Sequence, residues 1–129
     1  MGRISLVFDS GAVTALAKGN IEARSFVREA LKSGHGVVLP SVVVAETTRG
    51  TPRDAPIDRV IKHATVVALD LKLARMAGRL LHGARSKQTI DAIIVATADL
   101  APGSAILTGD ERDITALANV ERMTAVLPI

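Results

Sequence analysis

The sequence predicts an α/β fold. Short apolar runs alternate along the chain with longer stretches whose apolar residues recur at helical spacing. The chain has 129 residues, which is the usual size of one domain and is long enough to bury a core without disulfides. No low-complexity segment, long linker or internal repeat interrupts it. We therefore expect residues 1–129 to form a single domain.

The first elements are expected to be a strand and two helices. The apolar run 4–8 is predicted to be a strand that ends at Asp9, and Ser10 is a candidate cap for a helix over 12–17. A second, amphipathic helix is predicted over 21–32. Its inward face is expected to comprise Ile21, Phe26, Val27, Ala30 and Leu31.

The segment 41–49 is ambiguous. A second strand is expected over 37–39, where Pro40 stops it. The following run Val42-Val43-Val44 favours a strand, because β-branched residues suit a pleated surface. Pro40 and Ser41 instead favour the start of a helix. The residues alone leave both structures open.

The second half of the chain is predicted to continue the alternation. Strands are expected at 65–69, 105–108 and 125–127. Helices are expected at 56–63, 70–81, 89–100 and 113–118. The apolar face of the helix over 70–81 is expected to comprise Leu71, Ala74, Met76, Ala77, Leu80 and Leu81. A basic loop is expected over 82–87.

Composition excludes several classes of site. The chain has no cysteine, so disulfides and thiolate metal sites are ruled out. Aromatic residues make up 2% of it, which argues against recognition of bases by stacking. The net charge of +3 and the pI of about 9.8 are compatible with a polyanionic partner held through its phosphates. The mean hydropathy of +0.32 indicates either an apolar face hidden in an oligomer or a fully buried parallel sheet.

We expect the protein to be cytoplasmic. The start of the chain, residues 1–9, is too short and too soon charged for a signal peptide. No apolar run reaches the length needed to span a membrane, since Asp91 interrupts even the run 90–98.

Four acidic residues fall where a parallel sheet would bring them together. Asp9 follows the first expected strand and Asp110 the fourth, and both positions belong to the carboxyl edge of such a sheet. Asp91 opens an apolar helix, and Glu46 lies in an apolar stretch. Taken singly, each acid has an ordinary reading as a helix cap, first-turn acid, turn residue or surface acid. Together they would repel one another unless a cation lay between them, and an all-oxygen site suits a hard divalent ion.

Four segments carry a resemblance to a known family. They are Leu6-Val7-Phe8-Asp9-Ser10, Pro40-Ser41-Val42-Val43-Val44-Ala45-Glu46, Asp91-Ala92-Ile93-Ile94-Val95-Ala96-Thr97-Ala98 and Leu107-Thr108-Gly109-Asp110. In this order and spacing the chain resembles the PIN-domain family, in particular the VapC-type toxins of bacterial toxin–antitoxin pairs. The resemblance implies a mostly parallel sheet flanked by helices in three α/β/α layers, with a helix rather than a strand over 41–49.

The resemblance also implies an activity. It points to an endoribonuclease dependent on Mg²⁺ or Mn²⁺, in which metal-activated water attacks an RNA phosphodiester and leaves a 5′-phosphate and a 3′-hydroxyl. It implies homodimerisation and inhibition by a small cognate antitoxin protein. The number of metal ions, one or two, stays open.

Site residues follow from the matched segments. Asp9, Glu46 and Asp91 match the three most regular acids of the family, and Asp110 matches the more variable fourth. The resemblance implies Asp9 and Asp91 as the principal metal ligands, Glu46 as a direct or water-mediated ligand and proton acceptor, and Asp110 as the acid that completes the site. Asp113 is a second candidate for that last role, whereas Asp99 is expected to be exposed. Ser10 and Thr108 match polar positions that orient a carboxylate or water. The chain departs from the family at Ile114, where an aromatic is frequent, and at Gly11, where many relatives have a second hydroxyl or Asn.

Basic residues near these acids are candidate RNA contacts. They are Arg49, Arg53, Arg85, Lys87 and Arg112, and each of them singly also fits an ordinary solvated surface charge. His35, His63 and His82 share no motif with the acids and are expected to be structural or exposed.

Three alternatives remain at this point. A phospho-receiver domain has a similar length and pattern, but Asp70 lacks the acidic pair and the late Lys-Pro that such a domain needs. A haloacid-dehalogenase phosphatase would need Asp-x-Asp where this chain has Asp9-Ser10-Gly11. The third alternative is a PIN-like module without catalytic activity.

Overall fold

The fold is built on a five-stranded parallel sheet. The structure is a computed structural model that describes residues 5–129. The strands are β1 (Leu6–Phe8), β2 (Val37–Pro40), β3 (Thr65–Val67), β4 (Ala105–Thr108) and β5 (Ala125–Pro128). Their order is β3-β2-β1-β4-β5, and every neighbouring pair is parallel. The chain builds outward from β1 first in one direction and then in the other, so the strand order reverses between β1 and β4.

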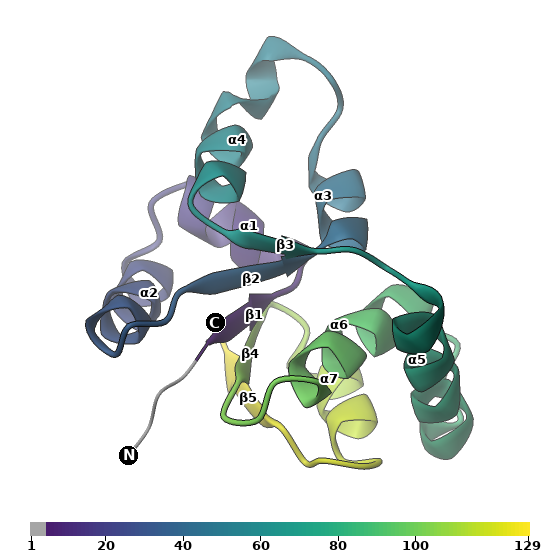
Figure 1. Cartoon of the computed structure of the whole chain (residues 1–129). Coiled ribbons are helices and arrows are strands. Elements are labelled where there is room, and N and C mark those ends of the chain that lie inside the picture. The colour runs from purple at the N-terminus through teal and green to yellow at the C-terminus, as the bar shows by residue number, and fades with distance from the viewer. Residues whose placement is uncertain (1–4) are drawn as a thin grey trace.

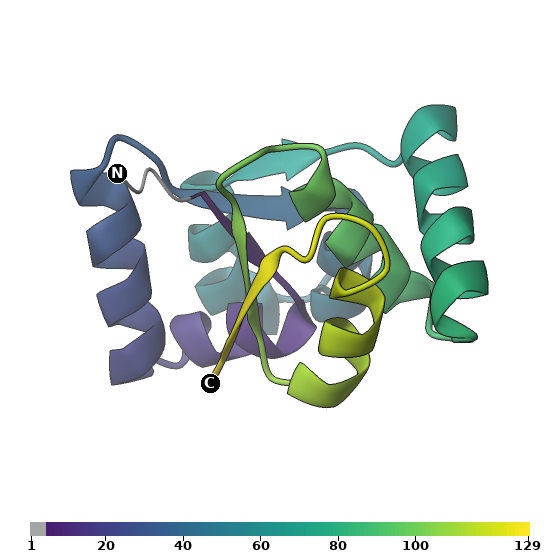
Figure 2. The same cartoon turned by 90° about the horizontal axis from the view of Figure 1, so that it is seen from below.

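Helices flank this sheet. They are α1 (Ser10–Ala17), α2 (Ile21–Lys32), α3 (Ser41–Thr47), α4 (Ala55–Lys62), α5 (Leu71–Ala84), α6 (Thr89–Asp99) and α7 (Glu111–Ala118), with a 3₁₀ turn at Pro52–Asp54. Helices α1, α2 and α4 lie on one side of the sheet and α5, α6 and α7 on the other (Figure 1). In both views α2 and α5 lie at opposite ends of the molecule (Figure 2). The predicted three-layer α/β/α fold is therefore confirmed.

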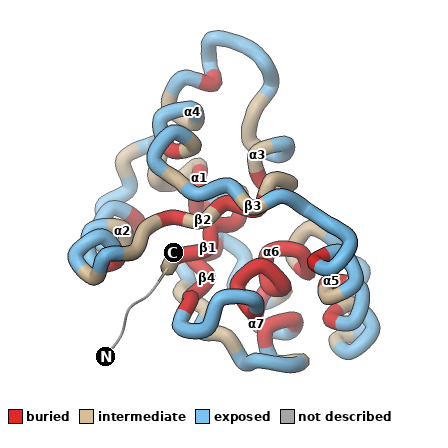
Figure 3. The backbone as a smooth tube through the Cα atoms, viewed as in Figure 1, coloured by how far each residue is buried: buried red, intermediate tan, exposed pale blue. Residues whose placement is uncertain are grey.

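The core lies on both faces of the central strands, and α6 is its most completely buried helix. All residues of β1 and β4 are buried, as is every residue of α6 from Ala92 onward, and Figure 3 shows this buried centre. Strands covered on both faces need apolar residues at every position, which explains why these strands are continuous apolar runs in the sequence. Each fully buried large side chain, such as Phe8 or Ile106, contributes roughly 1.5–3 kcal/mol.

Two local expectations needed correction. Ser10 does not cap the first helix: the cap is Asp9, whose side chain accepts a hydrogen bond from the Ala12 N–H, and the helix begins at Ser10. The stretch 82–87 is not wholly a loop, because α5 continues through Ala84 and ends at Arg85, whose φ is 51°. The ambiguous segment 41–49 is a helix over Ser41–Thr47, as the family resemblance implied.

Several predictions of which side chains are buried and which are exposed were wrong. Ile21, Leu31 and Leu71 are 84%, 61% and 67% exposed, and each lies near the end of its helix. Ala74 is exposed as well. Asp99, expected at the surface, is only 5% exposed, and Thr124, the residue before β5, donates a hydrogen bond to it. Among residues 5–129, no helix combines the length and apolar character needed to cross a membrane.

Candidate metal centre

Four of the predicted acids line one hollow at the carboxyl ends of the central strands. Asp9 follows β1 and Asp110 follows β4, so both lie where the strand order reverses. Glu46 reaches the hollow from α3, and Asp91 from the first turn of α6. We call this the acidic hollow. It measures about 550 Å³ and is lined by Asp9, Ser10, Gly11, Glu46, Lys87, Gln88, Thr89, Ile90, Asp91, Gly109 and Asp110.

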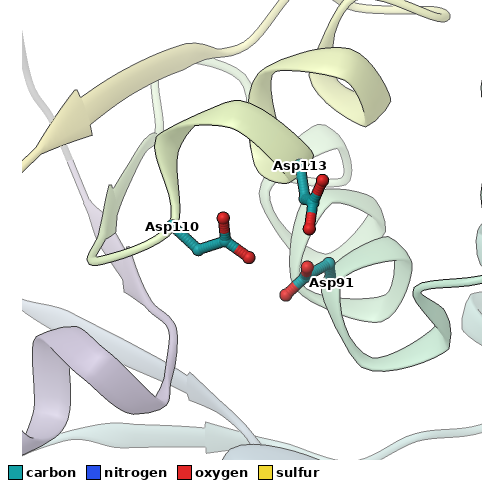
Figure 4. Close-up of side chains that lie close together, drawn as sticks. All are labelled: Asp91, Asp110 and Asp113. Atoms are coloured by element: carbon teal, nitrogen blue, oxygen red, sulfur yellow. The ribbon is translucent and has the colours of Figure 1, made fainter.

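Asp113 joins this group from the first turn of α7. Asp91, Asp110 and Asp113 each have a carboxylate oxygen within 4.8 Å of an oxygen of the other two (Figure 4). The sequence left Asp110 and Asp113 as alternatives for one role, whereas the structure places both beside Asp91. Carboxylate oxygens are hard donors that suit Mg²⁺ and Mn²⁺, with water completing the shell, so these residues fit the implied ion.

The Asp9 carboxylate is fixed by hydrogen bonds from three residues in two segments, the start of α1 and the end of β4 with the loop after it. Its Oδ1 accepts the Ala12 N–H at 2.8 Å, and its Oδ2 accepts the Thr108 hydroxyl and the Gly109 N–H, the latter at 3.2 Å. Thr108 is fully buried, and its Oγ1 also accepts the Asp110 N–H at 2.7 Å. One hydroxyl therefore ties the carboxylate of Asp9 to the backbone of Asp110.

The acids act on one another electrostatically. Burial, followed by the charges of Asp110, Asp9, Asp113 and Glu46, raises the pKa of Asp91 to about 6. Partial desolvation of its carboxylate, followed by the charge of Asp9, also raises the pKa of Glu46, although this residue is exposed. Within residues 5–129, none of these five acids forms an ion pair with Lys or Arg. The concentrated negative charge is thus not neutralised by the described part of the chain.

Gly11, two residues after Asp9, lies at a close approach of two backbone segments. A Cβ on Gly11 would lie 3.3 Å from the Gly109 Cα and 3.5 Å from Asp9 Oδ1. The start of α1 and the loop after β4 approach closely at these two glycines, so a larger side chain at Gly11 would push the loop away. Ile114, the other departure from the family pattern, is fully buried and is part of the core.

Only one of the predicted RNA contacts borders the acidic hollow. Lys87 lines it. The Arg49 guanidinium instead donates hydrogen bonds to the carbonyls of Glu46 and Thr48, at 3.0 and 2.8 Å. Arg53, Arg85 and Arg112 are exposed but are not part of the lining.

Two further polar residues line the hollow, and the three histidines lie outside it. Gln88 and Thr89 line the hollow but were not predicted from the sequence, although their place just before Asp91 is a signal that could have found them. None of the three histidines lines the hollow: His35 shares a hydrogen bond of 2.8 Å with the Ser5 hydroxyl, and His63 and His82 are exposed.

The fold and the hollow together define a class of protein: a parallel α/β domain with a carboxylate-lined candidate metal site at the reversal of strand order. A family model described as the PIN domain matches residues 6–120, and the chain belongs to the PIN domain family. A comparison with curated proteins found no match.

Solved structures resemble the chain over nearly its whole length. A toxin–antitoxin complex from Klebsiella pneumoniae matches with a TM-score of 0.70 and 19% identity, covering 95% of this chain and 96% of the other. VapBC2 from Rickettsia felis, bound to a promoter DNA fragment, matches with a TM-score of 0.73 and 12% identity, covering 98% and 99%. DNA-bound VapBC from Salmonella typhimurium gives 0.70 and 16%, covering 97% and 98%. At these identities the likeness establishes the shared fold.

Proposed function

We propose that this protein is a divalent-metal-dependent endoribonuclease, the toxin of a toxin–antitoxin pair. The observation that carries the proposal is the gathering of five carboxylates around one hollow, three of them with oxygens within 4.8 Å of one another. Membership of the PIN domain family supports it. So does the charge imbalance, because close carboxylates ionise together only when a cation offsets their repulsion.

The roles of the acids follow from their surroundings. Asp91, Asp110 and Asp113 would hold Mg²⁺ or Mn²⁺, while hydrogen bonds hold the Asp9 carboxylate in one orientation toward the same hollow. When bound, the ion would lower the pKa of water and offset charge on the phosphate. Glu46 is exposed and has a raised pKa, which suits a group that accepts a proton from the attacking water.

RNA is proposed as the substrate. The resemblance to VapC-type toxins points to RNA, and the net charge of +3 favours a polyanion. Lys87 lines the acidic hollow, and its ammonium would contact a phosphate that enters there. With such a substrate the protein would act in the cytoplasm, as a single domain over residues 1–129.

An antitoxin is the proposed protein partner. Two of the solved structures with this fold contain VapB–VapC pairs, and a third is described as a toxin–antitoxin complex. In this chain, an apolar hollow of about 560 Å³ lies between α1, α2 and α4. Leu16, Val27 and Leu31 contribute to its wall, and a hydrophobic segment of an antitoxin would fit it.

Homodimerisation completes the proposal. Val66, Leu69 and Leu71 are exposed by 45%, 40% and 67% around edge strand β3 and the start of α5. A cluster of exposed apolar residues beside an edge strand is typical of a surface that a partner covers. Analytical ultracentrifugation of the wild type and of Leu69→Ser/Leu71→Ser is expected to show a dimer and a monomer, respectively.

The decisive experiment measures cleavage of RNA with and without divalent ion. We expect cleavage by the wild type in Mg²⁺ or Mn²⁺, none in chelator, and at least a hundredfold loss in Asp91→Asn, since a transition-state contact of this kind contributes several kcal/mol. The matched control is Asp58→Asn, an exposed first-turn acid of α4 outside the hollow, which should retain activity. Metal-independent cleavage would contradict the metal-dependent mechanism, and no cleavage by the wild type under any condition would favour a non-catalytic interaction module.

A further inference from the structure

A second charged surface lies at the other end of α6. It is a groove of about 710 Å³ between α5 and the segments that follow α6 and α7. Its cations are Lys72, Arg75 and Arg79 from α5 and Arg122 from the turn before β5. We call these four residues and the hollow between them the basic groove.

The α5 cations form a row. Lys72, Arg75 and Arg79 are three and four residues apart, which places them on one face of the helix, about 5–6 Å from one to the next. All three are exposed. Such a row matches the backbone of a nucleic acid strand, which carries one negative charge for each nucleotide.

Most of the positive charge of the groove is not neutralised by ion pairs among the described residues. Arg79 is paired with Glu121, at 3.0 Å, across the surface. In the part of the chain that the structure describes, Lys72, Arg75 and Arg122 form no ion pair. The buried Asp99 borders the groove, but only 5% of it is exposed and its Oδ1 accepts the Thr124 hydroxyl at 2.5 Å.

The acidic hollow and the basic groove carry opposite charges. Lys87 is the only Lys or Arg that lines the acidic hollow, within residues 5–129, so a polyanion entering there meets mostly negative charge. Helix α6 joins the two places, with Asp91 in its first turn and Asp99 at its end. Eight residues of helix span about 12 Å, which a few nucleotides of one strand can cover.

We infer that the basic groove is a phosphate-binding exosite, which holds the RNA strand on one side of the phosphodiester that enters the acidic hollow. The inference rests on the proposed function, since it assigns a second contact to the same substrate. The very low aromatic content leaves phosphate contacts as the main source of affinity. Binding at the groove would therefore depend on strand length and on salt but little on sequence.

The experiment compares Lys72→Gln/Arg75→Gln with Lys18→Gln/Arg28→Gln. The control removes the same charge from exposed residues outside both hollows. Affinity for a single-stranded RNA is measured in chelator over a range of salt concentrations. Losing two phosphate contacts should reduce the magnitude of the salt slope by about 1.4 in the groove variant, at about 0.7 per contact, and leave the control near wild type.

Cleavage provides the second readout. With metal present, the groove variant should show a raised KM and an unchanged kcat on long RNA, and wild-type kinetics on an oligonucleotide too short to leave the acidic hollow. Equal salt slopes and KM values in the two double variants would overturn the exosite and leave the nuclease standing. A wild type that neither binds nor cleaves RNA would overturn both. A groove variant that handles RNA normally but no longer binds an acidic protein partner would also overturn it.

Discussion

At the scale of the residue, Thr108 connects the two halves of the candidate site. Its hydroxyl donates to the Asp9 carboxylate and accepts the Asp110 N–H, and the side chain is fully buried. Removing this hydroxyl takes one donor from the Asp9 carboxylate, which keeps its hydrogen bonds from Ala12 and Gly109, and takes the side-chain acceptor from the Asp110 N–H. Thr108 therefore orients Asp9 and Asp110, two of the acids around the hollow, although its own side chain carries no charge.

Replacing Thr108 by Val tests this connection. The shape is kept and the hydrogen bonds are lost, so we expect unfolding in urea to show a loss of about 1–3 kcal/mol. Affinity for Mn²⁺ should fall by roughly 10–100-fold, as for other residues that orient a metal ligand. Thr108→Ser retains the hydroxyl and should keep most of both quantities. Wild-type affinity for Mn²⁺ in Thr108→Val would contradict the role.

A second residue-scale prediction concerns pH. In the metal-free protein the pKa of Asp91 is raised from 3.8 to about 6, so the folded state binds its proton more tightly than the unfolded state does. Ionised Asp91 therefore destabilises the fold above pH 6, and this penalty disappears as the pH falls through 6 toward 4. The shift corresponds to at most about 3 kcal/mol, reduced by solvent screening because the group is only partly buried.

Asp91→Asn isolates that contribution. In chelator at pH 7.5 the variant should be as stable as the wild type or more so, and the difference should vanish near pH 4, measured by urea unfolding at each pH. A variant that is markedly less stable at pH 7.5 would show that Asp91 serves the fold and would argue against a metal-holding role.

At the scale of the element, α5 depends on one close approach. A Cβ on Gly83 would lie 2.6 Å from Cγ1 of Val120, in the turn after α7. Because valine is branched at Cβ, it cannot swing aside as a long side chain would. The last turn of α5 can pack here only because residue 83 has no side chain.

Two glycines of the same helix make a matched pair. Gly83→Ala is expected to destabilise the protein by about 1–3 kcal/mol through overpacking. Gly78→Ala should stabilise it by about 0.5–1 kcal/mol, because no atom lies within 4 Å of its added Cβ and alanine favours a helix. Thermal melting compares the two, and an equal change in both variants would refute the packing argument.

At the scale of the whole molecule, the candidate metal centre joins both sides of the sheet. Its acids come from the ends of β1 and β4 and from α3, α6 and α7. The ion would thus bind only the folded chain, because separate segments of the sequence supply its ligands. The strand order also excludes the receiver alternative, which has the order 2-1-3-4-5.

Linkage to metal binding follows from this arrangement. Mn²⁺ at one hundred times its Kd should raise the free energy of unfolding by about 2.7 kcal/mol, seen as a higher Tm. Asp91→Asn should respond much less, whereas Asp58→Asn should respond like the wild type. A Tm of the wild type that does not move with Mn²⁺ or Mg²⁺ would count against a metal centre in this hollow.

The sequence by itself determined the α/β class, the five strands and the acids that the carboxyl edge would gather. Strand and helix periodicity are local properties, and the ends of parallel strands share one edge whatever the connections. Local pattern also placed Asp9 and Asp110 next to the strands that bring them to the reversal of strand order.

Only the tertiary structure decided the rest. Val42–Val44 are helical because α3 packs against α1 and α6, which overrides their strand propensity. Asp99 is buried and bonded to Thr124, Asp113 of α7 meets Asp91 of α6, and Arg122 completes the basic groove from a distant turn. Each of these features depends on which segments become neighbours in the fold. The contacts that stabilise them join residues far apart along the chain, so no local pattern of the sequence contains them.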